Sequence, residues 1–253
     1  MKPRALIFDV DGTLADTEEA HRQAFNAAFL AHGLGWEWSA EEYGELLGVT
    51  GGKERIGKYL DALPLPAGDR EALRRLVPLV HRTKTQLFTE FVGMGNVPLR
   101  PGVARLIGEA RAAGVPLAIA STTTPANVNA LLTHALGLSA PGWFGAIATG
   151  DVVPNKKPAP DIYLLALGTL RLPAAGCVAI EDSALGVRAA KAAGLYTVAV
   201  PTSWTAAQDL GAADLVLPSL GDPREPLNAA AAARLGGAKM LGLAELERLL
   251  AAA

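Results

Sequence analysis

"ALIFDVDGTLADT", residues 5–17, is the stretch that decides the expected fold of this chain. It begins as a short, continuous apolar run, which is typical of a buried strand in a parallel sheet. In an extended chain alternate side chains share a face, so Asp9 and Asp11 point the same way while Val10 points into the core. Gly12 then turns the chain. Two carboxylates are therefore expected at the carboxyl edge of a sheet, where open α/β proteins bind their ligands.

Downstream of residue 100, helical patterns alternate with short apolar runs. Three of the helical patterns end on a glycine, and Ser183 is in position to cap one of them. Helices are expected over 101–114, 125–137, 158–170, 183–194 and 242–250, and strands over 115–121, 145–149, 177–182, 196–200 and 213–217. This alternation predicts an α/β fold with a doubly wound parallel sheet that is covered by helices on both faces.

Between residues 16 and 92 the chain has helical patterns and no convincing strand. Asp16 and Ser39 each begin a capping-box pattern, with a glutamate three residues later. The stretch 69–91 is expected to form one long helix that is kinked or split at Pro78. The chain is therefore expected to divide into a sheet domain, residues 1–15 and 93–253, and a helical segment, residues 16–92, inserted after the first strand.

The composition excludes several classes of partner. Lysine and arginine number 23 and aspartate and glutamate 25, so the net charge of -2 gives no global field for nucleic acid or a membrane surface. Cys177 is the only cysteine, which excludes an intramolecular disulfide and fits a reducing compartment. No apolar run approaches the ~18 residues of a membrane span or has the form of a signal peptide. We therefore expect a cytoplasmic protein without nucleic-acid or membrane partners. A monomer is the default expectation, although the sequence itself does not give the oligomeric state.

Polar side chains follow the apolar runs at several further points. Ser121 with Thr122 and Thr123 follows the second strand, and Glu181 with Asp182 follows a later one. Between these two points Lys157 lies just before a helix. Because the carboxyl ends of parallel strands converge, these groups are expected in one crevice with the first two aspartates. Two carboxylates ~5 Å apart repel by about 3 kcal/mol at an effective dielectric constant of ~20. Either some acids stay protonated or a cation lies among them, and an oxygen-rich site with room for water suits Mg²⁺.

This set of groups is suited to phosphoryl transfer. A carboxylate can attack phosphorus and form an aspartyl-phosphate, while a metal ion and a lysine hold charge on the transferring oxygens. A second carboxylate can protonate the leaving oxygen and then activate water against the intermediate. We therefore expect one aspartate of the DVDGT stretch to attack and the other to move protons.

Four stretches, in this order, resemble the four motifs of the haloacid dehalogenase superfamily of phosphatases and mutases. They are DVDGT (9–13), AIAST (118–122), KKPAPD (156–161) and IEDS (180–183). The resemblance implies Asp9 as nucleophile, Asp11 as acid and base, Ser121 as phosphate ligand and Lys157 as charge clamp. It implies a metal held by Asp9, by Asp11 through its backbone carbonyl, and by Glu181 and Asp182. The fold it implies is a Rossmann-like sheet with the first strand central and residues 16–92 as an α-helical cap.

Further stretches are similar to one branch of that superfamily, the CbbY-type xylulose-1,5-bisphosphate phosphatases associated with the Calvin cycle. They are ADTEEAHRQAFN (15–26), TGGKERI (50–56), STTTPANV (121–128) and KKPAPDIY (156–163). The resemblance implies a small phosphorylated sugar as substrate, contacted by Glu18, His21, Tyr43, Thr122 and Thr123. One stretch, LGVTGG (47–52), departs from this branch, because Gly48 and Val49 are closer to the broad phosphatase and mutase pattern.

A glycine-rich cationic turn gives an independent reason to expect a bisphosphate. The turn consists of Thr50, Gly51, Gly52, Lys53 and Arg55 and is expected to open a helix. Helix N-termini and basic side chains bind anions, so these residues are candidates for a second phosphate site. The alternative for the two basic residues is a solvated helix face.

The sequence leaves several other functions open. A phosphomutase similar to β-phosphoglucomutase, or a phosphoglycolate phosphatase, would share the whole core, whereas a metal-free dehalogenase has less use for a second aspartate. A phospho-signalling receiver domain also gathers acids, a hydroxyl and a lysine, but it lacks a helical segment after its first strand. Two roles are open for His21, packing in the core or contact with a ligand. His81, Arg82 and Lys84 are expected on a solvated helix face.

Overall fold

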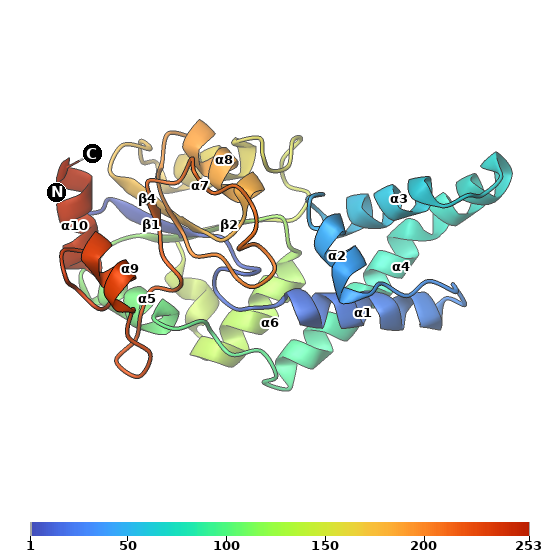
Figure 1. Cartoon of the computed structure of the whole chain (residues 1–253), viewed down its shortest axis with the longest axis horizontal. Helices are drawn as coiled ribbons and strands as arrows, with labels where there is room; N and C mark the ends of the chain where they lie inside the picture. Colours follow the sequence, from blue (N-terminus) through green and yellow to red (C-terminus); the bar gives the residue numbers. More distant parts are fainter. Residues whose placement is uncertain (1, 253) are drawn as a thin grey trace.

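The computed structural model describes residues 2–252 and contains a six-stranded sheet in the order β3-β2-β1-β4-β5-β6 (Figure 1). The strands are β1 (Ala5–Phe8), β2 (Leu117–Ser121), β3 (Ala146–Thr149), β4 (Cys177–Glu181), β5 (Tyr196–Ala199) and β6 (Leu215–Val216). Every neighbouring pair is parallel. The predicted α/β fold is confirmed, and β1 lies inside the sheet between β2 and β4, as the resemblance implied.

Helices cover both faces of this sheet. The helices α7 (Asp161–Leu170) and α8 (Ala184–Ala192) lie on one face, and α5 (Val103–Ala112) and α6 (Pro125–Leu136) lie on the other (Figure 1). A 3-10 turn (Ala140–Trp143) precedes β3, and α9 (Ala229–Arg234) and α10 (Leu243–Ala252) pack on the α5 side. Along β1, Leu6 and Phe8 belong to the apolar cluster on the α5 side, whereas Ala5 and Ile7 belong to the cluster under α7 and α8. Both faces of β1 are therefore buried, which explains its continuous apolar run.

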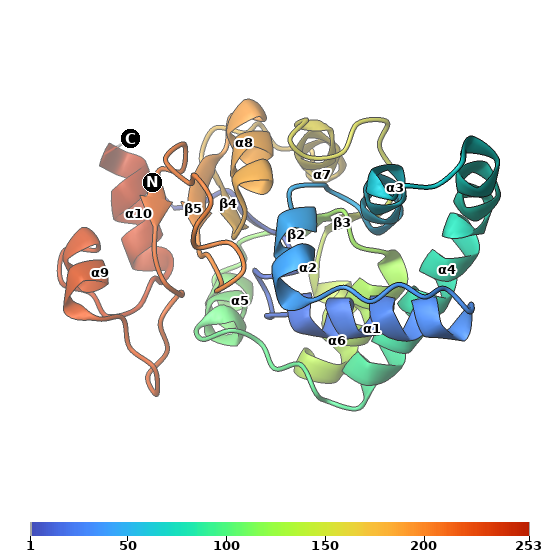
Figure 2. The same ribbon diagram turned by 45° about the vertical axis from the view of Figure 1, so that its right-hand side comes forward.

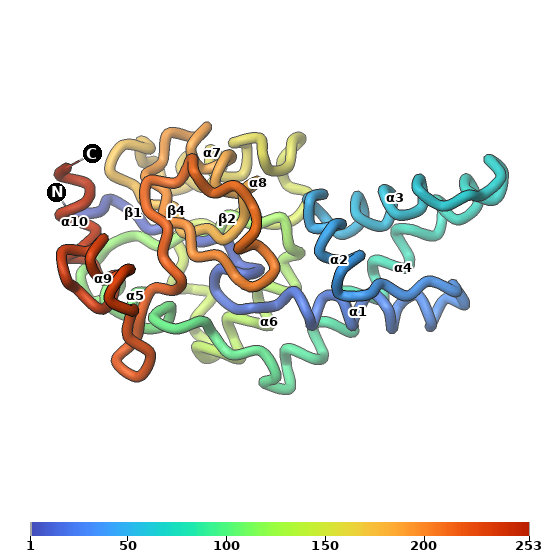
Figure 3. Tube along the Cα trace, viewed as in Figure 1, coloured from blue at the N-terminus to red at the C-terminus, as the bar shows by residue number. Residues whose placement is uncertain are grey.

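The helical segment stands beside the sheet at its carboxyl edge (Figure 2). It consists of α1 (Glu18–Ala31), α2 (Ala40–Leu46), α3 (Gly52–Ala62) and α4 (Ala67–Gly93). Figure 3 shows the two passages of the chain between sheet and helices, one after β1 and one after α4. The ring centres of Phe25 and Phe29 each lie 4.8 Å from the ring centre of Trp38, and all three side chains are buried. This cluster gives the helical segment an apolar core of its own.

The longest helix, α4, is the single long helix expected here, and it continues through Pro78 rather than splitting there. Val77 and Val80, on either side of the proline, are buried in the core of the helical segment. Their packing holds both halves of the helix in place although proline removes one helical hydrogen bond. Within residues 2–252, neither α4 nor any other helix combines the length and the apolarity that crossing a bilayer requires.

Only one of the two residues expected to begin a capping box caps its helix. Ser39 caps α2, since its hydroxyl accepts from the N–H of Glu42 over 3.1 Å. Asp16 does not cap α1, whose N-cap is Thr17. The Thr17 hydroxyl instead donates to Asp11 Oδ1 over 2.7 Å, so the start of α1 is tied to an acid of the predicted site.

Candidate active site

A pocket lies between the carboxyl edge of the sheet and the helical segment, and most of the predicted site residues line it. These are Asp9, Asp11, Glu18, His21, Thr50, Gly51, Gly52, Arg55, Ser121, Thr122, Thr123, Lys157 and Asp182. The sheet domain supplies them from the ends of β1, β2 and β4 and from the turn before α7. The helical segment supplies them from α1, from the turn before α3 and from the start of α3. Tyr43, Lys53 and Glu181 are not among the lining residues.

Lys157 lies buried between two acids from different strands. Its ammonium group donates to Asp9 Oδ1 over 2.6 Å and to Glu181 Oε1 over 2.5 Å. The hydroxyl of Tyr163 donates to the same Glu181 oxygen over 2.5 Å. The side chains of Lys157 and Glu181 are only 5% and 0% exposed. Glu181 therefore lies behind the pocket, where it fixes the lysine rather than facing the open space.

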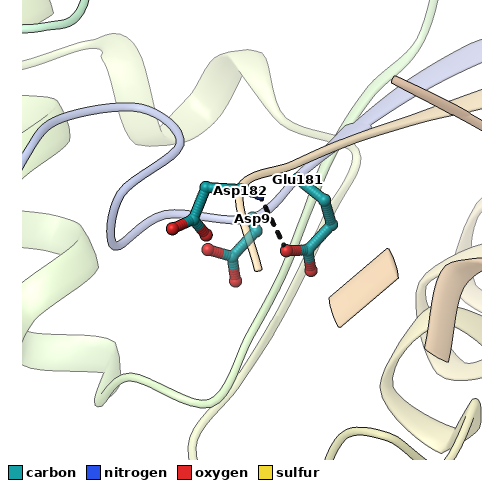
Figure 4. Close-up of side chains that lie close together, drawn as sticks. All are labelled: Asp9, Glu181 and Asp182. Carbon is teal, nitrogen blue, oxygen red and sulfur yellow. Dashed lines mark hydrogen bonds between the residues drawn. The ribbon is translucent and has the colours of Figure 1, made fainter. Parts of the chain in front are cut away.

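Asp9, Glu181 and Asp182 form a cluster of buried carboxylates (Figure 4). One oxygen of each lies within 4.8 Å of the other two. Burial raises the pKa of Asp9 to about 7, with a further contribution from the charge of Glu181, although Lys157 lowers it. Burial and the neighbouring acids also hold the pKa of Asp182 well above its usual range. One lysine is therefore not enough to keep all three acids ionised at neutral pH.

The acid cluster fits a divalent cation. A cation beside these groups would favour their ionised forms, which burial and mutual repulsion disfavour. All the side-chain donors are carboxylate oxygens, the ligand type that Mg²⁺ and Ca²⁺ take. Asp9, Glu181 and Asp182 could hold such an ion, and the backbone carbonyl of Asp11 as a further ligand stays a prediction.

Gly12 leaves the space that Asp182 occupies. Its φ of +80° lies in the left-handed region, and a Cβ at this position would overlap the Asp182 carboxylate. The guanidinium of Arg100 donates to the carbonyl oxygens of Gly12 and Val200, which ties this turn to the end of β5. The glycine of DVDGT is therefore needed both for the turn and for the close approach of an acid from another strand.

A chain of polar contacts from the helical segment holds Asp11. Its Oδ1 accepts from the Thr17 hydroxyl over 2.7 Å and from His21 Nε2 over 2.9 Å. The other ring nitrogen of His21 lies 2.5 Å from Lys84 Nζ, and the imidazole stacks on Phe88 with 3.8 Å between ring centres. Burial, and then the charge of Lys84, lower the pKa of His21. The ring is thus neutral at neutral pH, and its partners place the proton on Nε2.

The same contacts keep Asp11 ionised. Burial acts to raise its pKa, but the hydrogen bonds from His21 and Thr17 and the charge of Lys84 lower it, so the pKa lies below its usual range. His21 therefore contacts an acid of the pocket as well as packing on an aromatic ring.

The structure corrects the expectation for two of the three basic residues on the long helix. Arg82 is exposed as expected, but His81 and Lys84 line the pocket, and Lys84 is only 4% exposed. Lys84 Nζ lies over the rings of Phe25 and Phe88, 4.7 and 5.0 Å from their centres. A signal was present in the sequence, because Lys84 lies four residues before Phe88 on the buried face of α4.

Because of Lys84, the free energy of unfolding should depend on pH in the alkaline range. Burial lowers the pKa of Lys84 to about 7, whereas an unfolded lysine has a pKa of ~10.4. Between these values the unfolded chain keeps a proton that the folded chain has lost, so the free energy of unfolding rises with pH. Relative to Lys84→Met, the wild-type protein should gain up to about 1.4 kcal/mol per pH unit between about pH 7.5 and 9.5.

Urea unfolding of both proteins across this pH range measures the difference. Lys58→Met is the control for the loss of a lysine, because Lys58 is exposed on α3 and away from the pocket. A pH-independent difference for Lys84→Met would mean that Lys84 stays charged in the folded protein.

Tyr43 reaches the pocket through two neighbours. Its hydroxyl donates to Glu18 Oε2 over 2.6 Å and accepts from Arg55 Nη1 over 2.7 Å. Burial raises the pKa of Tyr43 well above its usual range, so the hydroxyl keeps its proton. Tyr43 thus holds Glu18 and Arg55, both of which line the pocket.

Lys53 is not brought to the pocket, contrary to the expectation of a substrate contact. Its ammonium group pairs with Asp151, in the loop after β3. The same carboxylate lies 2.8 Å from Lys156 Nζ, and Lys156 also pairs with Glu54 over 2.6 Å. The competing carboxylate of Asp151 explains the orientation of Lys53. Spacing could not reveal this pair, because its members lie 98 residues apart in the chain.

Ser121, Thr122 and Thr123 line the pocket at the end of β2. The oxygen of the buried Ser121 side chain accepts from the N–H of Thr123 over 3.4 Å. Thr124 caps α6 by accepting from the N–H of Asn127, so the first turn of α6 begins at the pocket. Hydroxyls and N–H groups in this position are suited to phosphate oxygens.

The chain has close relatives among known proteins. Residues 3–194 match the family of haloacid dehalogenase-like hydrolases. The CbbY protein of Cupriavidus necator is 54% identical over 224 residues, which is 88% of each chain. The CbbY protein of Rhodobacter capsulatus is 50% identical over 220 residues, 87% of this chain and 95% of that protein.

A solved structure agrees with these relatives. The crystal structure of CbbY from Rhodobacter sphaeroides in complex with phosphate matches with a TM-score of 0.79 and 46% identity, over 88% of this chain and 98% of that chain. A mutant of the same protein has been crystallised in complex with xylulose-(1,5)bisphosphate. The family match spans all four motif stretches, so the resemblance drawn from them is confirmed. The chain belongs to the haloacid dehalogenase-like hydrolases and, within them, to the CbbY proteins.

Proposed function

We propose that this hydrolase is a Mg²⁺-dependent sugar-phosphate phosphatase that converts xylulose 1,5-bisphosphate to xylulose 5-phosphate through a phosphoaspartyl intermediate. The observation that carries the proposal is the convergence of Asp9, Asp11 and Lys157 on one pocket, beside the cluster of three acids. The complex of the Rhodobacter sphaeroides relative with xylulose-(1,5)bisphosphate supports the choice of substrate.

In this proposal Asp9 is the nucleophile. Its carboxylate forms a bond to phosphorus while the bond from phosphorus to the sugar oxygen breaks. Lys157, 2.6 Å from Asp9, holds charge on the transferring oxygens, and Ser121 binds a remaining oxygen. Asp9, Glu181, Asp182 and the carbonyl of Asp11 would hold Mg²⁺, which supplies neutralising charge for the acids and the phosphoryl oxygens.

Asp11 is the proton carrier in this proposal. The negative phosphate of a bound substrate favours its protonated form, which can protonate the leaving sugar oxygen. The resulting carboxylate then accepts a proton from the water that hydrolyses the phosphoaspartate. Thr17 and His21 fix one oxygen of Asp11 for both steps.

We further propose that the helical segment, residues 16–92, is the cap that binds the second phosphate. The turn over 50–52 and Arg55 line the same pocket as Asp9. The N-terminus of α3 and a guanidinium are suited to a phosphate dianion. A substrate charged at both ends would therefore contact both parts of the chain.

Arg55→Ala should raise KM for xylulose 1,5-bisphosphate by about tenfold or more, because a hydrogen bond to a charged group contributes ~1.5–3 kcal/mol. The KM for the monophosphate p-nitrophenyl phosphate should change little, since that substrate has no second phosphate. Lys53→Ala is the matched control and should change KM by less than about threefold, because Lys53 pairs with Asp151. Equal effects of the two variants would contradict this assignment of the second phosphate site.

A phosphate-release assay tests the function. Xylulose 1,5-bisphosphate, ribulose 1,5-bisphosphate, phosphoglycolate and glucose 1-phosphate are compared at equal concentration, with and without a chelator. We expect the fastest release from xylulose 1,5-bisphosphate, loss of release with chelator, and recovery with added Mg²⁺. Release that is unaffected by chelation, or faster from phosphoglycolate, would overturn the proposal. Substrate loss without free phosphate would point to a phosphomutase instead.

A further inference from the structure

The loop that follows β5, residues 201–208, contacts both the acid cluster and the helical segment. The hydroxyl of Thr205 donates to Asp182 Oδ2 over 3.2 Å. The neighbouring Trp204 packs edge-on against the ring of Tyr43 in α2, with 5.6 Å between ring centres and 90° between ring planes. Thr205 is 3% exposed and lines the pocket. Adjacent side chains of one loop thus contact an acid of the cluster and a residue of the cap.

Hydrogen bonds within the loop fix the direction of the Thr205 hydroxyl. Its oxygen accepts from the N–H of Thr202 over 3.0 Å, and its single proton is directed to Asp182 Oδ2 at 3.2 Å, which is nearer than the Thr202 hydroxyl at 3.5 Å. The N–H of Trp204 donates to the Thr202 hydroxyl over 3.1 Å. Gln208 Oε1 accepts from the first N–H of α8 over 2.8 Å, so the far end of the loop is also held.

We propose that Thr205 is a positioning residue that orients Asp182 for a divalent cation, and that Trp204, by packing against Tyr43, links this orientation to the position of the cap. The inference rests on the proposed function. Tyr43 holds Glu18 and Arg55 at the pocket. The loop therefore joins the groups proposed to bind the sugar phosphate to a group proposed to bind the metal. If the packing of the cap on Trp204 strengthens cation binding, then by thermodynamic linkage cation binding strengthens that packing by the same factor.

The test measures Mg²⁺ affinity by titration calorimetry on the full chain without substrate. Thr205→Val keeps the shape of the side chain and removes the hydroxyl, and it should weaken Mg²⁺ binding by about tenfold, as loss of a partner behind a metal ligand commonly does. Thr205→Ser restores the hydroxyl and should bind within about twofold of wild type. Ser203→Ala removes an exposed hydroxyl from the same loop and should also bind within about twofold.

Wild-type affinity in Thr205→Val would overturn the positioning role. So would an equally weak Thr205→Ser, because the hydroxyl would then not be the cause. A wild-type protein that binds no Mg²⁺ would contradict the proposed function rather than this inference. Thermal melting of each variant confirms that it is folded.

A double-mutant cycle tests the part played by Trp204. Trp204→Ala alone should weaken Mg²⁺ binding by about threefold, because it acts only through the loop. In the double variant with Thr205→Val, the loss should be smaller than the product of the two single losses. Losses that multiply, or an unchanged affinity in Trp204→Ala, would overturn the link between the cap and Asp182.

Discussion

Asp9→Asn is expected to lower phosphate release by at least about 10³-fold while the protein stays folded. The amide cannot supply the negative oxygen that attacks phosphorus. It fits the site, because burial already raises the pKa of Asp9 to about 7 and a neutral group is tolerated there. Lys157 keeps its contact with Glu181 over 2.5 Å, so it is not left without a partner. The free energy of unfolding should therefore change by less than about 2 kcal/mol.

Initial rates of phosphate release and urea unfolding check both parts of this expectation. Asp61→Asn is the control, because Asp61 is an exposed acid of α3 that pairs with Arg74 away from the pocket. Because Asp61 lies away from the pocket, its removal should leave turnover unchanged. The free energy of unfolding should change little, since an exposed ion pair contributes only ~0–1 kcal/mol to it. A folded Asp9→Asn protein that keeps a tenth of wild-type turnover would exclude Asp9 as the nucleophile.

The fold could be predicted because local pattern and tertiary structure agree in the sheet domain. The run before Asp9 is continuous and apolar because Ala5 and Ile7 face one layer of helices and Leu6 and Phe8 the other. The register of β1 with β2 and β4 then brings the ends of three strands to one edge. Parallel topology alone therefore places Asp9 near Ser121 and Glu181, whatever the loops between them do.

The part of the site that the helical segment supplies could not be predicted to the same depth, because there the orientation of a side chain depends on packing between distant elements. Lys84 lies inside because α4 packs along α1, which puts Lys84 beside His21. Lys53 lies outside because a loop of the sheet domain offers it the Asp151 carboxylate. Thr205 gave no signal in the sequence, because its role depends only on where the loop after β5 meets Asp182.

Lys157→Met is expected to lower the free energy of unfolding by about 3–5 kcal/mol at pH 8 and to remove most of the activity. The variant leaves Asp9 and Glu181 buried without the ammonium group that lies 2.6 and 2.5 Å from them. Burial raises the pKa of Asp9 to about 7 even though Lys157 lowers it, so this pKa should rise further in the variant. Mg²⁺ should restore part of the lost stability, since it would bring positive charge to the same acids.

The sign of the pH dependence separates this effect from a simple loss of packing. An acid whose pKa is raised in the folded state holds a proton there that the unfolded chain, with a pKa of ~4, has lost. Stability therefore falls as pH rises through this window, and the defect of Lys157→Met should be smaller at pH 6 than at pH 8. Lys156→Met is the matched control, because the neighbouring lysine pairs outside the cluster with Glu54 and Asp151, whose side chains are 41% and 54% exposed. It should lose clearly less stability than Lys157→Met at pH 8. Urea unfolding of the two variants at both pH values, with and without Mg²⁺, measures these differences. Equal losses for the two lysines, or a Lys157→Met defect that is the same at both pH values, would mean that Lys157 does not offset the charge of the acid cluster.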